Sequence, residues 1–285
     1  MNAQRLGWAP YALLLPSFAF LAFFFAAPMA QAFGLAFQDA SGAWGLASIR
    51  RMVGDAQFRE ALVTTLVLIV AIIPIQFALA LGMALVVNAR LKGSGFWLYV
   101  YALPLGISDL AAGITWFAVF TERGWLNSFL EGLGLIDRPI FFLGYQNPFW
   151  LIAAVVLAEA WRATAIIMII LVAGLQGIPR DFLEAADVFG ATSWQKVRRV
   201  ILPMLRPSVQ VALILRTILA FQAFAVVIAL AGQGLTVLSS EAYRWYLDYR
   251  DPHVAAAYAA FILLLSVLST LLFLWLLPVR QEQTG

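Results

Sequence analysis

The chain has 285 residues, of which 63% are hydrophobic and only 12% are charged, and its formal net charge is +3. Soluble domains carry roughly 45–50% apolar and about 25% charged residues, so this composition excludes an ordinary soluble domain. Cysteine is absent and His253 is the single histidine, which excludes disulfides, thiolate metal sites and multi-histidine metal sites. No basic run is interleaved with aromatic residues, so nothing indicates nucleic-acid binding.

The hydrophobic residues gather in six blocks, each long enough to cross roughly 30 Å of hydrocarbon as a helix. Because backbone polar groups must be satisfied inside lipid, these blocks predict helices and not the short alternating strands of a membrane barrel. The predicted spans are 11–33, 61–87, 96–120, 150–172, 208–231 and 254–277. Kinks are expected at the prolines inside them, which include Pro16, Pro28, Pro74 and Pro104. The expected fold class is an all-α membrane protein in which residues 1–285 form one domain.

The start of the chain admits a second interpretation. Arg5, the apolar run after it and the small residues Ala30 and Ala32 are similar to a cleaved signal peptide. The run exceeds the roughly 7–15 apolar residues usual in such peptides, which favours a retained span. Detection of Phe33 as the mature N-terminus would contradict a retained span.

Orientation follows from the basic residues, which concentrate on the cytoplasmic side of membrane proteins. With the N-terminus inside, nine basic residues fall inside and seven outside, and the cluster from Lys196 to Arg206 decides the assignment. An even number of spans then places both termini in the cytoplasm. The inside residues are Arg5, Arg90, Lys92, Arg180, Lys196, Arg198, Arg199, Arg206 and Arg280.

Ionisable residues inside membrane spans are costly, and they usually face the protein interior or pair with one another. The predicted spans contain Asp109, Glu159, Arg162 and Arg216. Glu159 and Arg162 are three residues apart on one helix, so they are expected to form an i,i+3 pair, with direct solute contact as the alternative. Asp109 and Arg216 either pair across helices or lie near the outer and inner edges of the membrane.

The segment 174–207 is a polar loop on the predicted cytoplasmic side and fits two short helices. Pro179 suits the first turn of the first helix, and Gly190 suits a reversal after it because glycine accepts positive φ. Thr192 or Ser193 is expected to cap the second helix, and Pro203 is expected to end it.

The two helices of this loop allow two interpretations. Phe182, Ala185, Ala186 and Phe189 share one face of the first helix, and Lys196, Arg198 and Arg199 make the second helix basic. Such segments either lie on a membrane surface, against lipid headgroups, or bind a cytoplasmic protein partner.

The same loop contains several residues at characteristic offsets. Glu184-Ala185-Ala186, Gly190-Ala191, Ile201-Leu202-Pro203 and Pro207 resemble the EAA signature of bacterial ABC-importer permeases. Phe189 stands where that family usually has aspartate, and Val197 where it often has phenylalanine. Further stretches resemble the carbohydrate-uptake branch, of the maltose and glycerol-phosphate permease type. They are Leu103-Pro104 with Trp116, Gly124 with Leu126-Asn127 and Leu130, Trp161, Gly174-Leu175 with Ile178-Pro179, and Phe221 and Phe224 with 232–236.

The resemblance implies a type I ABC-importer permease fold with a cytoplasmic coupling helix. By this likeness Glu184 makes a polar contact with an ATPase subunit, Ala185 and Ala186 allow close approach, Gly190 sets the turn, and Pro203 belongs to the same coupling segment. The implied partners are a second homologous permease, two cytoplasmic ATPases and an extracytoplasmic solute-binding protein. The chain contains no G-x-x-x-x-G-K-[ST] loop, so we expect no enzyme activity and no cofactor on this chain, with ATP and magnesium on the ATPases. The implied location is the cytoplasmic membrane of a bacterium or archaeon.

Aromatic faces and fixed polar groups bind sugars, and several such residues fall near the predicted midplane. For each of them the alternative is plain packing or an interfacial belt position. These pathway candidates are Trp116, Trp161, Phe221, Gln222 and Phe224. A second aromatic group in the predicted outer loop either touches a solute-binding protein or rests at the membrane surface: Tyr243, Arg244, Trp245, Tyr246 and Tyr249.

Two other classes of protein remain open at this point. An ion-gradient-driven secondary transporter often shows inverted repeats, but the two halves of the chain show no convincing repeat. The other class is a membrane-embedded assembly protein without a transport role. The sequence leaves maltose-like, trehalose-like, polyol and glycerol-phosphate solutes equally open.

Overall fold

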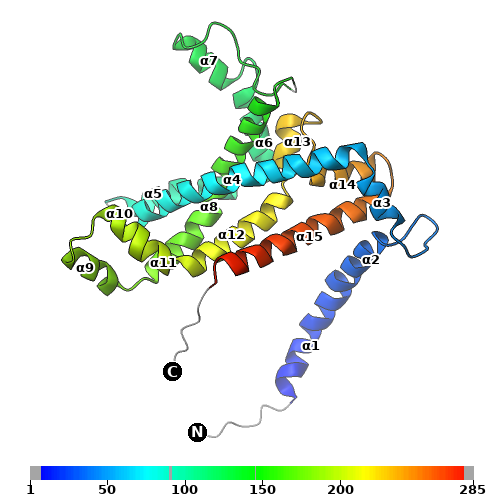
Figure 1. The fold of residues 1–285 in the computed structure, drawn as a ribbon, viewed down its shortest axis with the longest axis horizontal. Helices are drawn as coiled ribbons and strands as arrows, with labels where there is room; N and C mark the ends of the chain where they lie inside the picture. The colour runs from blue at the N-terminus through cyan, green and yellow to red at the C-terminus, as the bar shows by residue number, and fades with distance from the viewer. Residues whose placement is uncertain (1–7, 90–91, 145, 279–285) are drawn as a thin grey trace. The chain divides into compact units, whose positions relative to one another are not determined.

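A computed structural model describes residues 8–89, 92–144 and 146–278, and within them the chain is almost entirely helical (Figure 1). The one strand-like feature of that part is an isolated bridge between Gln38 and Trp44. The chain divides into two compact units, the first comprising the residues up to Arg59 with Glu241–Phe261, and the second Glu60–Ser240 with the residues from Ile262. Arg5, Arg90 and Arg280, which entered the orientation prediction, lie outside the described residues.

The first unit begins with the helices of residues 9–35, and side-chain contacts connect its later segments to one another. Its elements are α1 (Ala9–Leu21), a π-helical turn (Ala22–Ala26), α2 (Ala27–Leu35), α3 (Ala47–Val53), most of α14 (Leu238–Leu247) and the start of α15 (Pro252–Leu276). The carboxylate of Asp55 accepts hydrogen bonds from Trp245 Nε1 at 3.0 Å and from the Tyr258 hydroxyl at 3.1 Å. Arg51 pairs with Asp251 at 2.7 Å. These contacts join segments nearly 200 residues apart in sequence.

The second unit is built around one long helix, α8 (Pro148–Gln176). Its other elements are α4 (Ala56–Asn88), α5 (Ser94–Ala102), a 3₁₀ turn (Leu103–Gly106), α6 (Asp109–Phe120), α7 (Trp125–Gly132), α9 (Arg180–Val188), α10 (Ser193–Lys196), a π-helical turn (Val197–Ile201), α11 (Leu202–Met204), α12 (Arg206–Phe221) and α13 (Ala225–Ala231). In α8 the apolar residues recur so closely that much of its circumference is buried, as expected for a central helix.

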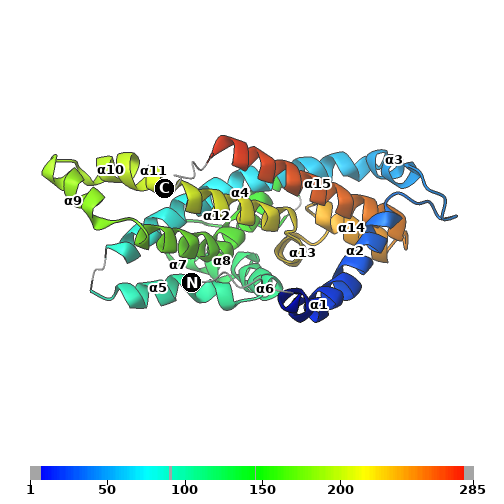
Figure 2. The ribbon, with the colours of Figure 1, turned by 90° about the horizontal axis from the view of Figure 1, so that it is seen from below.

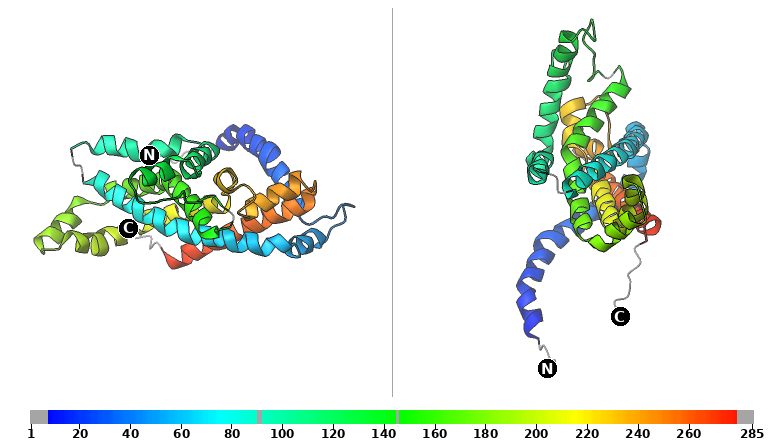
Figure 3. Two further views of the ribbon diagram at one scale, coloured as in Figure 1. Left: turned by 90° about the horizontal axis from the view of Figure 1, so that it is seen from above. Right: turned by 90° about the vertical axis from the view of Figure 1, so that its left-hand side faces the viewer.

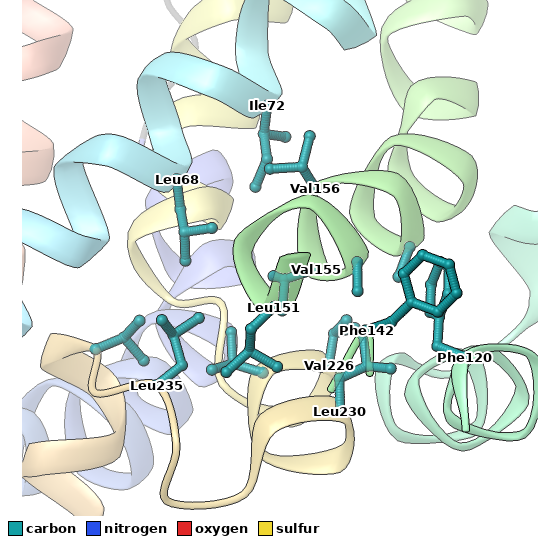
Figure 4. Packing of buried hydrophobic residues seen from close by; sticks show 14 residues of the cluster. Leu68, Ile72, Phe120, Phe142, Leu151, Val155, Val156, Val226, Leu230 and Leu235 are labelled. Atoms are coloured by element: carbon teal, nitrogen blue, oxygen red, sulfur yellow. The ribbon is translucent and has the colours of Figure 1, made fainter. Parts of the chain in front are cut away.

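The apolar core beside the first half of α8 contains residues of four helices and two loops. Figure 4 shows Leu68 and Ile72 of α4, Val155 of α8, Val226 of α13 and Phe142 of the loop before α8 turned toward one another. A second apolar cluster surrounds the other half of α8 and includes residues of α4 and α12. Glycine permits the closest helix contacts, because a Cβ on Gly113 of α6 would lie 2.6 Å from the Ala229 Cβ of α13.

Four helices among the described residues are long and apolar enough to cross a membrane: Pro10–Leu35, Ala56–Asn88, Pro148–Gln176 and Pro252–Leu276. Six result if two bent pairs each count as one span, namely Ser94–Gly106 with Asp109–Gly132, bent by 99°, and Ser193–Met204 with Arg206–Phe221, bent by 72°. The helix continues through Pro16 and Pro74 without interruption.

Two predicted spans are interrupted, the first at Pro104, where a kink was expected, and the second at a position where the sequence predicted a continuous helix. In 96–120 the chain passes through a 3₁₀ turn at Pro104, and Ser108 then caps α6 by accepting a hydrogen bond from the Ala111 N–H. In 208–231 the helix unwinds between Gln222 and Phe224. The Ser239 hydroxyl donates to the Ala223 carbonyl at 2.7 Å, which satisfies one backbone group that the break leaves free.

The two ends of α8 carry different structures. The loop with α7 precedes its first residue, and the short helices α9 to α11 follow its last. At 1.5 Å per residue, the 29 residues of α8 extend roughly 43 Å, enough to separate the two sides of a bilayer. Figure 2 shows α9, α10 and α11 together at one end of the second unit, and the same yellow-green segment lies at that end in the left view of Figure 3.

Candidate functional site

The helix α9 ends in a hydrogen-bonded reversal at Gly190. The Gly190 N–H donates to the Asp187 carbonyl at 2.9 Å, and the Ala191 N–H donates to the Ala186 carbonyl at 3.0 Å. Gly190 has a φ of 71°, a left-handed conformation that favours glycine at the end of a helix. The predicted turn residue therefore occupies the position that requires it.

The helix after the reversal begins with a complete capping box. Thr192 accepts a hydrogen bond from the Gln195 N–H, and the Gln195 side chain accepts one from the Thr192 N–H. Of the two predicted caps, Thr192 is the one used. Lys196 pairs with Asp187 at 2.7 Å, so α9 and α10 are joined by a side-chain contact as well as by the turn. We call residues 180–196 the coupling hairpin.

The prediction that Pro203 ends the second helix is wrong. Helical structure continues to Met204, with Pro203 in the first turn of α11. A proline ring normally clashes with the carbonyl four residues earlier, here Arg199, and that residue lies in the wider π-helical turn Val197–Ile201. The same arrangement recurs at Pro28, which follows the π-helical turn Ala22–Ala26. The wider turns accommodate both prolines within a continuing helix.

The coupling hairpin exposes large apolar side chains. Val188 is 86% exposed and Phe189 89% exposed, and Glu184 and Ala185 on α9 are exposed as well, with Ala186 half-buried. Trp194, at the start of α10, is 69% exposed. Exposed apolar side chains that lie next to one another indicate an interaction surface, and the coupling hairpin carries such a set.

The four predicted intramembrane charges form one network in the second unit. Arg216 of α12 pairs with Glu159 of α8 at 2.5 Å, and its Nε donates to Gln76 Oε1 of α4 at 2.7 Å. The Gln76 amide nitrogen donates to the Glu159 carbonyl at 2.7 Å. Arg162 of α8 pairs with Asp109 of α6 at 2.7 Å and lies 3.6 Å from Glu159. Residues from four helices are thus held together by two cations, two anions and an amide.

The network is buried at one end and open at the other. The side chains of Arg216 and Glu159 are 1% and 2% exposed, whereas that of Arg162 is 14% and that of Asp109 is 51% exposed. The Nε of Arg162 is buried and has no hydrogen-bond partner within the described residues. The expected Glu159–Arg162 pair exists, but each residue has a nearer partner on another helix.

Two of the predicted pathway aromatics lie together. The rings of Trp116 and Trp161 meet edge to face with centroids 6.0 Å apart, and Trp116 also stacks on Phe120 at 5.1 Å. Trp161, next to Arg162 in sequence, is 36% exposed. The aromatic pair thus combines a packed ring with a partly accessible one.

The other three pathway candidates lie at the break between α12 and α13. Phe221 is only 4% exposed and packs in the interior. Gln222, which ends α12, is exposed, and Phe224, which begins α13, is half-buried. Sequence reasoning did not select Gln76, although an amide in a predicted span is itself a signal of an interhelical hydrogen bond.

Comparison with known proteins gives a family. Residues 57–280 match the family described as "Binding-protein-dependent transport system inner membrane component". The chain is 30% identical to the trehalose/maltose transport system permease protein MalF of Thermococcus litoralis, over 84% of this chain and 81% of that protein. It is 34% identical to the trehalose transport system permease protein SugA of Mycobacterium tuberculosis, over 66% of this chain and 59% of that protein.

Solved structures show the same fold. A bacterial ABC transporter that imports the acidic polysaccharide alginate matches with a TM-score of 0.78 at 24% identity, over 94% of both chains. The alginate transporter in complex with a pentasaccharide-bound periplasmic protein matches with a TM-score of 0.76 at 25% identity, over 93% of this chain and 92% of that one.

The helices and apolar spans are those of a multi-pass membrane protein with the type I ABC-importer permease fold. The chain belongs to the binding-protein-dependent transport system inner membrane components, in the carbohydrate-uptake branch of that family. It is a permease subunit and not an enzyme. The resemblance found in the sequence is confirmed.

Proposed function

We propose that this chain is one of two membrane-spanning subunits of an ATP-driven saccharide importer, and that the coupling hairpin transmits ATPase motion to it. The observation that carries the proposal is the exposure of Phe189 and Val188 beside Glu184 on a hairpin that is already fully folded. The backbone of the hairpin is satisfied by its own turn, and the capping box and an ion pair reinforce it. The exposed side chains of Val188 and Phe189 therefore do not stabilise the fold, and we assign them to the contact with a partner.

Closure of two ATPase subunits would move the coupling hairpin as a rigid piece. Because α8 enters the hairpin directly and α12 follows it, such a movement would tilt both helices and switch the pathway between its two open sides. ATP and magnesium would be bound by the ATPase subunits. The hairpin, and with it both termini, would then lie on the cytoplasmic side, and the loop with α7 on the outer side.

A mid-membrane carboxylate that is half-exposed needs water or another protein beside it, because lipid contact would be costly. Asp109 falls in a predicted span and is half-exposed, and Arg162, whose Nε has no hydrogen-bond partner among the described residues, pairs with it. We propose that this edge of the second unit faces the solute pathway against a second, homologous permease. Trp161 and Trp116 would offer aromatic faces to a sugar ring, and Gln222 a polar group.

The solute would be delivered by an extracytoplasmic binding protein. Support comes from the similar alginate transporter, which was solved in complex with a pentasaccharide-bound periplasmic protein. Similarity to permeases of trehalose, maltose and lactose systems favours a saccharide as the solute.

Charge reversal at Glu184 tests the docking role. Glu184→Lys alters an exposed side chain, so the importer is expected to assemble in the membrane normally. Uptake in proteoliposomes should fall to background, and the ATPase activity of the complex should no longer respond to the loaded binding protein. Glu131→Lys, at an exposed position of α7, is the matched control and should retain both activities. Unchanged uptake by Glu184→Lys would refute the proposal.

A secondary transporter is the alternative that the same experiment separates. Uptake by an ATP-driven importer requires nucleotide inside the vesicles and is indifferent to an ionophore. Uptake that persists without ATP and collapses with an ionophore would instead identify a gradient-driven carrier.

A further inference from the structure

The loop between α6 and α8 borders an open cavity of about 990 Å³ that the pathway described above does not use. It lies at the end of α6 and the start of α8, and every residue that lines it belongs to the second unit. Its volume falls in the range of roughly 300–1,000 Å³ that is typical of small-molecule sites. The cavity is therefore large enough for a ligand of more than one sugar ring.

The walls of the cavity are held in place from behind. The buried amide of Asn127 donates to the carbonyls of Thr121 and Ile140 and accepts from the Ile140 N–H, at 3.2, 3.0 and 2.9 Å. Phe142, in the loop, is 6% exposed and meets Phe120 at 5.6 Å between ring centroids. Figure 4 shows these two rings side by side. These contacts hold the part of the loop from Ile140 to Phe142 against α6 and α7.

Aromatic rings and polar groups share the lining. Phe117 of α6 is 45% exposed, Phe141 of the loop 61% and Trp150 of α8 36%. Trp150 is held edge to face against Phe142, with centroids 5.4 Å apart, which fixes the plane of its ring. The polar lining residues are Thr121, Glu122, Arg123, Gln146 and Asn147, and the last four are exposed.

This combination suits a saccharide. The C–H faces of a sugar ring are apolar and pack on aromatic rings, while its hydroxyls require directional donors and acceptors. Amide side chains supply both a donor and an acceptor, and a carboxylate and a guanidinium extend that set. A purely apolar groove would lack partners for the sugar hydroxyls, and a flat polar surface would lack aromatic rings for the C–H faces.

We propose that this cavity is a saccharide-binding site on the outer face of the permease, which receives the sugar after it leaves the binding protein and before it enters the membrane. The assignment of this face to the outside rests on the proposed function. Phe117 and Phe141 act as platforms for the sugar ring, and Gln146 with Glu122 binds its hydroxyls.

The test measures sugar binding to the assembled importer without its binding protein. The complex in lipid nanodiscs is titrated with maltose, trehalose, lactose and an alginate trisaccharide, and saturation-transfer NMR detects the bound sugar. We expect transfer to at least one of the four. Phe141→Ala should weaken that binding about 2–10-fold, the scale of one aromatic contact, and the double variant with Phe117→Ala should abolish it.

Phe129→Ala is the matched control, because Phe129 is 48% exposed on α7 and does not line the cavity. It should leave sugar binding unchanged. The affinity of the loaded binding protein for each variant is measured in parallel and should also be unchanged.

Three results would overturn the assignment. They are no transfer to any of the four sugars, transfer that Phe117→Ala and Phe141→Ala together leave intact, or weaker docking of the binding protein with sugar binding unaffected. ATP-dependent uptake by the same preparations reports separately on the proposed function. A preparation with ATP-driven uptake and no sugar at the cavity rejects only the saccharide site, and uptake that needs no ATP rejects only the importer.

Discussion

Arg216 and Glu159 form a nearly dry ion pair in the second unit, with side chains 1% and 2% exposed. Such a pair gains little over apolar side chains of similar size, but removal of one partner leaves a buried charge and costs about 3–5 kcal/mol. Moving α8 away from α12 would leave one of these charges buried without its partner. The free-energy cost of that unpaired charge keeps the two helices in one arrangement.

The single variant Arg216→Met is expected to lose stability on that scale, and the double variant with Glu159→Met should recover most of it. Thermal unfolding in detergent, followed by tryptophan fluorescence, measures both. Asp109→Asn is the control, because the Asp109 side chain is 51% exposed and its pair with Arg162 should contribute at most about 1 kcal/mol. A double variant no more stable than the single one would show that the pair is not the cause.

The pairing of the charges was not predictable from spacing alone. Glu159 and Arg162 stand at i and i+3, yet their close partners are Arg216 and Asp109, on helices that only the tertiary fold brings near. Sequence reasoning identified all four charged residues because each is conspicuous in an apolar block. It could not assign partners across helices, and it overlooked Gln76, whose cost in lipid is smaller.

Among the helical elements, the coupling hairpin was predicted most closely. The glycine, the Thr192 cap and the two short helices depend on local backbone chemistry, which adjacent residues determine. Pro203 failed as a stop signal because the wider turn at 197–201 accommodates it, and no propensity rule predicts that turn. A kink was predicted at Pro104, but its extent as a break over 103–108 was not, and the break at 222–224 was missed, because apolar composition reports length and not straightness.

Gly190→Ala tests the reversal at the end of α9. A Cβ at this position would meet nothing within 4 Å, so the only penalty is the positive φ, about 1–2 kcal/mol. We expect a normally assembled importer with reduced uptake and reduced stimulation of its ATPase. Gly82→Ala, in α4, also meets nothing within 4 Å but has an ordinary helical backbone, and it should transport like the parent protein. Equal uptake by the two variants would contradict a functional need for the left-handed turn.

At the scale of the whole molecule, the class of protein followed from composition, from six apolar blocks and from the motif in the loop 174–207. These properties belong to the chain as a whole, so an error of a few residues in the boundary of one predicted span does not change the inferred class. Which helices cross the bilayer, and where each enters it, stays a prediction, because helix length and hydropathy do not place a membrane. The cavity before α8 was not predictable, because its lining is assembled from a loop and two helix ends.

The half-exposed Asp109 has a consequence for assembly of the importer. Asp109 falls in a predicted span, where a half-exposed carboxylate requires a neighbour other than lipid, so this chain should not form a working pathway by itself. Vesicles that contain it with the ATPase subunits alone are expected to show no solute uptake. Addition of the second permease and the binding protein should restore uptake, measured with radiolabelled sugar. Robust transport by the chain and ATPase alone would exclude the heterodimer.

The ion pair between α8 and α12 also bears on biogenesis. Glu159 and Arg216 lie 57 residues apart, so the ribosome releases α8, with both Glu159 and Arg162, well before Arg216 of α12. At the observed scale of roughly +2.5–3.5 kcal/mol for a charge at the centre of a helix, neither segment partitions into lipid as readily alone as the two do together. Until α12 is translated, Arg162 on the same helix is the counter-charge available to Glu159, and the coupling hairpin lies in the interval between the two helices.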